Sequence, residues 1–207
     1  MDVGELLKRE RIVPVVVIDD AAKAVPLART LMEAGLNSIE VTLRSAAALA
    51  AIEQIATKVP GLIVGAGSLR RSEQVSDIRE AGAQFAVAPG WAPGLLDAAE
   101  VAGLPLLPGA ATAAEMMQLF ERGYALQKFF PAELAGGIPY LRAVGAPLPE
   151  LRFVPTGGIT AELAGDYLAL PNVAAVGGTW ITPKCLLDAG DFDRIGQLAA
   201  DAIAIGM

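Results

Sequence analysis

Eight short runs of apolar, mostly β-branched residues recur along this 207-residue chain, with starts about 20 to 27 residues apart. Ala-rich stretches with helical periodicity separate the runs, and several of them end in Gly, as at Gly35 and Gly82. Such alternation predicts strand–helix units that form a parallel sheet covered by helices. The runs are IVPVVVI (12–18), SIEVTL (38–43), LIVGAGS (62–68), QFAVAPG (84–90), PLLPGA (105–110), ALQKFFP (125–131), RFVPTGG (152–158) and VAAVGGT (173–179).

Eight units is the number found in a closed (β/α)8 or TIM barrel, so we expect an α/β fold in one domain spanning residues 1–207. A doubly wound open sheet uses the same unit and stays as the alternative. Residues 2–10 are predicted to form an N-terminal capping helix at the bottom of the barrel. Residues 191–205 are predicted to form a closing helix.

The chain has no histidine and one cysteine, Cys185. This composition excludes an internal disulfide, a multi-cysteine metal cluster and any Ser-His-Asp or Cys-His mechanism. Proton transfer in an enzyme of this composition falls to Asp, Glu, Lys, Tyr or a thiol. We interpret Cys185 as a small packed apolar residue, not as a nucleophile.

The net charge is −7, which argues against a nucleic-acid surface but permits an anionic ligand held by backbone amides. None of the apolar runs approaches the roughly 20 residues of a membrane span. The first 20 residues lack the basic segment and small-residue cleavage site of a signal peptide. We therefore expect a cytoplasmic protein with no nucleic-acid or membrane partner.

Of the five lysines, only Lys128 stands inside an apolar strand, LQKFFP. An ammonium group is costly to bury, and burial favours the neutral amine, which is the nucleophilic form. Lys128 is therefore a candidate nucleophile. The structural alternative is a lysine that is salt-bridged or reaches along the strand to solvent.

The second strand, SIEVTLR, places Glu40, Thr42 and Arg44 on one face, because side chains alternate along a strand. One interpretation is a buried Glu–Arg pair that stabilises the barrel interior. The functional interpretation is a carboxylate acid/base near the lysine, with Arg44 at the mouth of the barrel for a substrate anion.

Glycine-rich segments follow the last two strands, at Gly157-Gly158 and at Gly177-Gly178. Phosphate sites of (β/α)8 barrels are frequently built from these two loops. Tight turns use the same residues and are the alternative explanation. The GAGS segment that ends at Ser68 lacks a full nucleotide-binding pattern, so we interpret the Ser68 hydroxyl as a donor to substrate.

Taken together, EVTLR (40–44), GAGS (65–68), KFFPAE (128–133), PTGGI (155–159) and GGTW (177–180) resemble the 2-keto-3-deoxy-6-phosphogluconate (KDPG) / 4-hydroxy-2-oxoglutarate aldolase family. The resemblance runs along nearly the whole chain. It implies a (β/α)8 barrel, a homotrimer and a class I, metal-free aldolase of a phosphorylated keto acid. No cofactor is implied, because the intermediate is a covalent Schiff base.

By resemblance, Lys128 is the Schiff-base lysine and Glu40 is the general acid/base. Arg44 matches the arginine that binds the substrate carboxylate. Ser68 falls where the family usually has a threonine that contacts the pyruvate moiety. The further substrate-binding positions implied by the resemblance are Pro89, Phe130, Gly157, Gly158, Gly178 and Thr179.

Besides Ser68, the chain departs from the family at GAATAAE (109–115), where relatives usually carry a GIST-like segment. Alternatives for the function are cleavage of the C4 epimer, 2-keto-3-deoxy-6-phosphogalactonate, or of unphosphorylated 4-hydroxy-2-oxoglutarate. A phosphosugar epimerase or isomerase would keep the phosphate loops without needing Lys128. A phosphosugar-binding barrel without turnover is the alternative outside catalysis.

Overall fold

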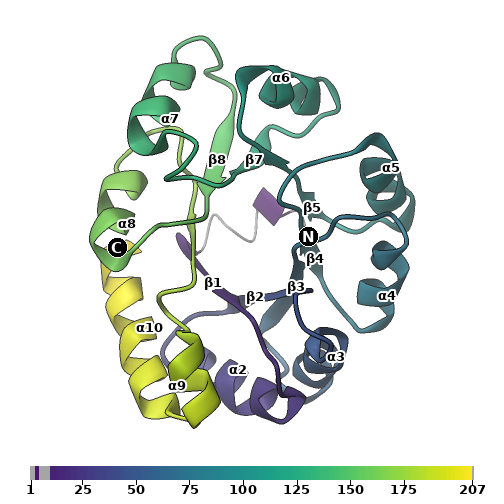
Figure 1. The fold of residues 1–207 in the computed structure, drawn as a ribbon, viewed down its shortest axis with the longest axis vertical. Helices are drawn as coiled ribbons and strands as arrows, with labels where there is room; N and C mark the ends of the chain where they lie inside the picture. The colour runs from purple at the N-terminus through teal and green to yellow at the C-terminus, as the bar shows by residue number, and fades with distance from the viewer. Residues whose placement is uncertain (1–2, 5–9, 207) are drawn as a thin grey trace.

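The structure is a computed structural model that describes residues 3–4 and 10–206. Its strands form a ring with the helices on the outside (Figure 1). The strands are Ile12–Val16 (β1), Ser38–Thr42 (β2), Ile63–Gly67 (β3), Phe85–Val87 (β4), Leu106–Leu107 (β5), Gly109–Ala110 (β6), Leu126–Phe129 (β7), Arg152–Pro155 (β8) and Val176–Gly178 (β9).

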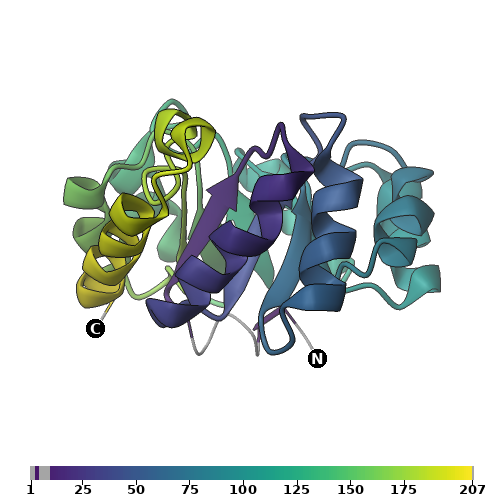
Figure 2. The same cartoon turned by 90° about the horizontal axis from the view of Figure 1, so that it is seen from below.

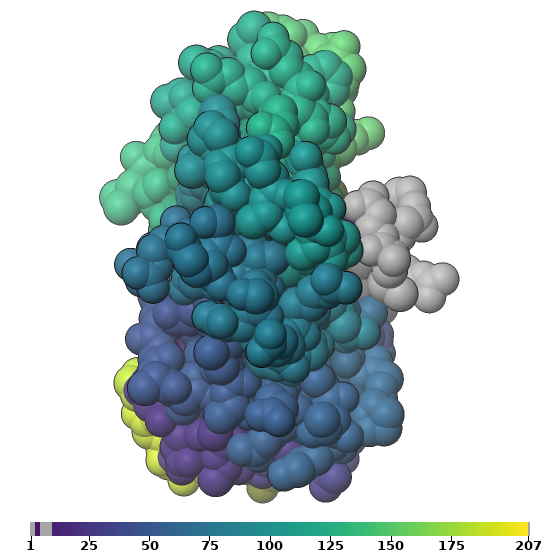
Figure 3. All heavy atoms as spheres, turned by 90° about the vertical axis from the view of Figure 1, so that its right-hand side faces the viewer, coloured from purple at the N-terminus to yellow at the C-terminus, as the bar shows by residue number. Residues whose placement is uncertain are grey.

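Ten helical segments of the described chain connect or follow these strands, and each lies outside the ring (Figures 1 and 2). They are Ala21–Lys23 (η1, a 3-10 helix), Ala24–Glu33 (α2), Ala48–Lys58 (α3), Gln74–Glu80 (α4), Pro93–Ala102 (α5), Ala113–Glu121 (α6), Gly137–Gly145 (α7), Ala161–Leu168 (α8), Lys184–Ala189 (α9) and Phe192–Gly206 (α10). The space-filling view of Figure 3 shows the side of the molecule whose surface includes the part of the chain from α3 to α6.

All eight predicted strand regions contain strands, and every pair of hydrogen-bonded strands is parallel in the described chain. The predicted closing helix is confirmed as α10. Of the predicted N-terminal helix, residues 3–4 are helical, and the rest lies mostly outside the described residues. Cys185 is exposed on α9, so its interpretation as a packed residue was wrong.

The closed eight-stranded ladder that we expected appears as two sheets. One has six strands in the order β5-β4-β3-β2-β1-β9, and the other has three in the order β6-β7-β8. Pro108 separates β5 from β6 within the single predicted run, because proline has no N–H to donate to a ladder. Two isolated parallel bridges, Phe153–Val173 and Thr156–Gly177, join β8 to the chain segment that contains β9.

The core has two parts, which follow from the alternation of side chains along each strand. Outward-facing residues such as Ile39, Val41 and Phe129 pack against the helices in a continuous apolar layer. A smaller cluster fills the lower interior of the ring and leaves the interior near the carboxyl ends of the strands to polar side chains. Its members are Val3, Val13, Phe85, Val87, Leu107, Val154 and Ala175.

No helix among residues 3–4 and 10–206 combines the length and apolar character needed to cross a bilayer.

Candidate active site

Lys128 and Glu40 form an ion pair in the interior of the ring. The distance between Lys128 Nζ and Glu40 Oε1 is 3.5 Å, and the two side chains are only 6% and 4% exposed. Glu40 Oε1 is buried and has no hydrogen-bond partner among the described residues. The pair therefore offers an amine and an open carboxylate acceptor at one point, shielded from bulk water.

The outer face of β7 explains why Lys128 points inward. Its neighbour Gln127 donates to the carbonyl oxygens of Met116 and Tyr124, at 2.9 and 2.8 Å. On the other side, Phe129 stacks on Tyr140, with ring centroids 5.5 Å apart. These two contacts fix the outward face of β7, so Lys128 between them must face the interior.

A cavity of about 220 Å³ opens onto the pair at the carboxyl ends of the strands. Nine of the ten predicted site residues line it, which brings together side chains from β2 and β7 and from the loops that follow other strands. Its lining residues are Val15, Glu40, Thr42, Arg44, Ser68, Pro89, Lys128, Phe130, Thr156, Gly157, Gly158, Ile159, Gly177 and Thr179.

Arg44 lies at the exposed mouth of this cavity. Its Nε donates to Thr42 Oγ1 at 3.3 Å, and that hydroxyl donates to the carbonyl oxygen of Val16 at 3.0 Å. The structural alternative, a Glu40–Arg44 pair, is not the arrangement observed, since the partner of Glu40 is Lys128. Among the described residues, the terminal nitrogens of Arg44 donate no hydrogen bond.

Ser68 follows β3 in a left-handed conformation, with φ of +62°, the single non-glycine residue of the described chain with positive φ. Such a conformation is strained for an L-residue and persists only where neighbours enforce it. Here Leu43 N donates to Gly67 O at 2.8 Å and Leu69 N donates to Val87 O at 3.1 Å, so the chain is held on both sides of Ser68.

Phe130 borders the amine, with its ring centroid 5.3 Å from Lys128 Nζ. Gly157 and Gly158 have φ of +104° and +83°, a region that favours glycine. Gly178 is the predicted residue that does not line the cavity. Its missing side chain instead makes room for the ring of Trp180, since a β-carbon there would lie 1.6 Å from a ring atom.

Comparison with known proteins identifies the family. A family model described as KDPG and KHG aldolase matches residues 3–198. The chain belongs to this aldolase family. The resemblance inferred from the motifs is thereby confirmed.

Among curated relatives of this family, a 2-dehydro-3-deoxy-phosphogluconate aldolase of Pseudoalteromonas atlantica is 46% identical over 93% of this chain and 90% of its own length. A KHG/KDPG aldolase of Escherichia coli K12 is 45% identical over the same shares. A solved KDPG aldolase from Legionella pneumophila, with pyruvate captured as a covalent carbinolamine intermediate, is 38% identical over 98% of each chain, with a TM-score of 0.95.

Thr156 is a residue of the aldolase cavity to which the sequence analysis gave no role. It is 7% exposed, ends the β8 region and faces the interior beside Gly177, where a β-carbon would lie 2.4 Å from Thr156 Oγ1. The signal that could have found it is a polar residue between an apolar strand and a Gly-Gly turn.

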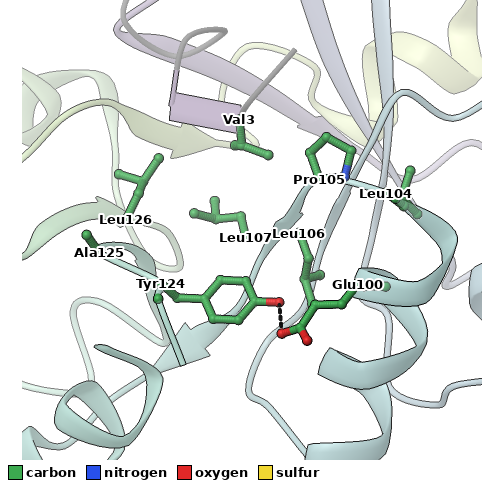
Figure 4. Close-up of a pocket in the computed structure, with 12 residues that line it drawn as sticks. Val3, Glu100, Leu104, Pro105, Leu106, Leu107, Tyr124, Ala125 and Leu126 are labelled. Atoms are coloured by element: carbon green, nitrogen blue, oxygen red, sulfur yellow. Dashed lines mark hydrogen bonds between the residues drawn. The ribbon is translucent and has the colours of Figure 1, made fainter. Parts of the chain in front are cut away.

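A larger cavity, of about 470 Å³, is lined by residues that lead into and begin β5 and β7, at the end of these strands opposite the cavity of Lys128. Figure 4 shows its lining residues. Its described lining is mostly apolar, and its titratable members are Glu100 and Tyr124, whose side chains are 3.3 Å apart. Burial raises the pKa of Tyr124 to about 12, so the phenol stays protonated. Since neither group can act as a nucleophilic amine, the smaller cavity is the candidate active site.

Proposed function

We propose that this chain is a class I aldolase that cleaves 2-keto-3-deoxy-6-phosphogluconate to pyruvate and glyceraldehyde 3-phosphate. The observation that carries the proposal is the buried pair of Lys128 and Glu40, 3.5 Å apart, at one cavity with Arg44 and Ser68. A sheltered amine beside a carboxylate supplies a nucleophile and a proton carrier without histidine.

In the first step, the Lys128 ammonium of the ion pair passes one proton by way of Glu40 to solvent, and the resulting neutral amine adds to the C2 carbonyl of the substrate. A proton moves from nitrogen to oxygen through Glu40, which gives a carbinolamine. Glu40, protonated from solvent, then gives a proton to the C2 hydroxyl, which leaves as water and produces the iminium. Glu40 Oε1 suits these proton transfers, because it accepts no hydrogen bond from the described residues.

In the second step, Glu40 removes the proton of the C4 hydroxyl, directly or through one water. The C3–C4 bond breaks, its electron pair moves into the iminium to give an enamine, and the aldehyde leaves. Glu40 then protonates C3 of the enamine. Water hydrolyses the resulting iminium to pyruvate and the free amine of Lys128, and the proton taken up at dehydration is released.

The remaining lining residues are proposed to hold the two ends of the substrate. Arg44 and Ser68 bind the carboxylate, since an arginine fork and a hydroxyl both donate to anionic oxygen. Gly157, Gly158 and Thr179 bind the phosphate, together with the loop at Gly178, through backbone amides and a hydroxyl. Pro89 and Phe130 form apolar walls that keep the reacting carbons near the amine.

Cleavage of 4-hydroxy-2-oxoglutarate is a second proposed activity, because the family model covers KHG aldolases and the E. coli relative carries both names. Comparing turnover of KDPG, its C4 epimer and 4-hydroxy-2-oxoglutarate ranks the substrates. A Lys128→Arg variant separates the aldolase from a phosphosugar epimerase, which would tolerate the change.

We also infer that the two sheets are parts of one closed (β/α)8 barrel in a single domain. In support, only Pro108 separates β5 from β6, and two parallel bridges link β8 to the segment of β9. Counted with β5 and β6 as one strand, the ring has eight. A homotrimeric assembly and a cytoplasmic location stay predictions of the sequence analysis.

The decisive experiment treats the protein with pyruvate and borohydride, followed by mass spectrometry of its peptides. We expect one reduced pyruvyl adduct, on Lys128. Lys128→Arg should abolish it, whereas Lys184→Arg should keep it, because Lys184 is exposed and paired with Asp19 and Asp188. A folded wild-type protein without adduct, or an adduct that survives in Lys128→Arg, would overturn the proposal.

A further inference from the structure

Gly67, the last residue of β3, lies directly against the carboxylate of Glu40. A β-carbon at Gly67 would be 2.1 Å from Glu40 Oε1 and 2.7 Å from both Cγ and Cδ. These separations are far inside van der Waals contact. The backbone of Gly67 does not have the positive φ that favours glycine, so conformation is not what demands a glycine here.

Neither side of this contact has free room. The backbone of Gly67 is fixed in the parallel ladder, where it pairs with Thr42 and its carbonyl accepts Leu43 N at 2.8 Å. Glu40 is 3% exposed, and its Oε1 faces Lys128. A methyl group at position 67 would therefore displace the carboxylate, because a side chain rotates more easily than a paired strand moves.

We propose that Gly67 is a positioning residue for the aldolase reaction. Because Gly67 has no side chain, the Glu40 carboxylate can lie against its backbone, 3.5 Å from Lys128 Nζ. This inference rests on the proposed function, since it assigns to Gly67 an effect on the proposed acid/base. Gly67 has no functional group of its own and acts only through Glu40.

Gly65 provides a matched comparison on the same strand and the same face. A β-carbon there would lie 2.2 Å from the ring of Phe85, which belongs to the apolar cluster of the lower interior. Its φ is also outside the left-handed region. Gly65→Ala thus imposes a similar clash one layer below the acid/base, and its cost should fall on stability.

The test is a double-mutant cycle of Gly67→Ala with Glu40→Ala, with Gly65→Ala as control. For each protein, kcat and KM for KDPG and the unfolding midpoint are measured. With Glu40 present, Gly67→Ala should lower kcat by at least about 10-fold with little change in KM. The complete loss of a general acid/base, usually about 10²–10⁴-fold, sets the upper limit. In the Glu40→Ala background, where the clash is gone, Gly67→Ala should change kcat by less than about 2-fold.

An equal loss in both backgrounds would overturn the inference, because it would mean a structural role for Gly67. Wild-type kcat in Gly67→Ala would overturn it as well. If Gly67→Ala alone fails to fold, recovery of the fold in the double variant supports the clash, and failure of both contradicts it. The pyruvate adduct tests the proposed function separately from this cycle. If wild type forms no adduct, the four unfolding midpoints still measure whether Gly67→Ala clashes with Glu40, so failure of the proposed function and failure of the clash are distinguishable.

Discussion

At the residue scale, the proposed chemistry depends on one carboxylate, Glu40, that is buried without a full set of hydrogen bonds. Glu40 Oε1 has no donor among the described residues, although Lys128 Nζ is 3.5 Å away. An unsatisfied buried acceptor typically costs about 1–3 kcal/mol. In the proposed reaction a substrate hydroxyl donates to Glu40 Oε1, so bound substrate would offset this cost.

Glu40→Gln is expected to lower kcat by roughly 10²–10⁴-fold, because the amide fills the same volume but cannot carry protons. The fold should be retained, as judged by circular dichroism and the unfolding midpoint. Glu80→Gln, at an exposed position of α4, is the control with unchanged kcat. If Glu40→Gln unfolds the protein while kcat per folded molecule stays at the wild-type level, Glu40 is a structural ion-pair partner instead.

Residues differ in how far the sequence could predict them. Lys128 stood out as a charge inside an apolar strand, and Glu40 shared the inward face of its strand by simple alternation. The left-handed backbone of Ser68 could not be predicted, since glycine or asparagine usually marks that conformation. The Glu40–Lys128 pairing was suggested only as proximity, because it depends on how distant strands face each other across the interior.

At the element scale, α6 begins within the GAATAAE segment, which the sequence analysis predicted to differ from the family pattern. In the GAATAAE segment, Gly109 and Ala110 form β6, and Thr112 caps α6. The Thr112 hydroxyl accepts Glu115 N at 3.3 Å, while Glu115 Oε2 accepts the backbone N–H groups of Ala111 and Thr112, both at 2.9 Å. This capping box fixes where the helix begins after β6.

The same box predicts a pH-dependent contribution to stability. The hydrogen bond from Ala111 N holds the pKa of the Glu115 carboxyl below its usual value, despite partial burial that opposes the shift. Since the folded-state pKa is the lower one, the stabilisation is present at neutral pH and is lost as the pH falls through that pKa. Glu115→Ala should therefore destabilise the fold by about 1 kcal/mol at pH 7.

Urea unfolding at neutral pH and at a pH below the normal carboxyl range measures this difference. The gap between wild type and Glu115→Ala should shrink in acid. Glu121→Ala, at the exposed end of the same helix, should show no comparable gap at either pH. A gap that is constant with pH would contradict an ionised Glu115 as the stabilising group.

Strand positions were predictable from apolar runs, whereas strand lengths were not. The run 105–110 was interpreted as one strand and is divided at Pro108 into β5 and β6. The run 173–179 contributes only Val176–Gly178 as β9. Both differences arise because a strand extends only as far as its backbone N–H and C=O groups are paired. This pairing depends on the neighbouring strand as well as on the apolar run itself.

At the scale of the whole molecule, the resemblance to the family predicts a homotrimer. Native mass spectrometry or light scattering should give three times the 21.3-kDa chain mass. The mass should not depend on substrate, because the described cavity lining comes from a single chain. A monomer that is fully active at assay concentration would contradict the prediction of an obligate trimer. Assembly could not be derived from periodicity, which reports only on packing within the chain.

The pairing of β1 with β9 has a consequence for biosynthesis. Glu40 and Lys128 are translated well before residues 176–178, but the six-stranded sheet gains its last strand only when β9 aligns beside Ile12–Pro14. Gly177 also meets Thr156 at the cavity. A chain that ends before residue 176 would hold both proposed catalytic groups in an unfinished pocket, so we expect catalytic turnover only after β9 has been added.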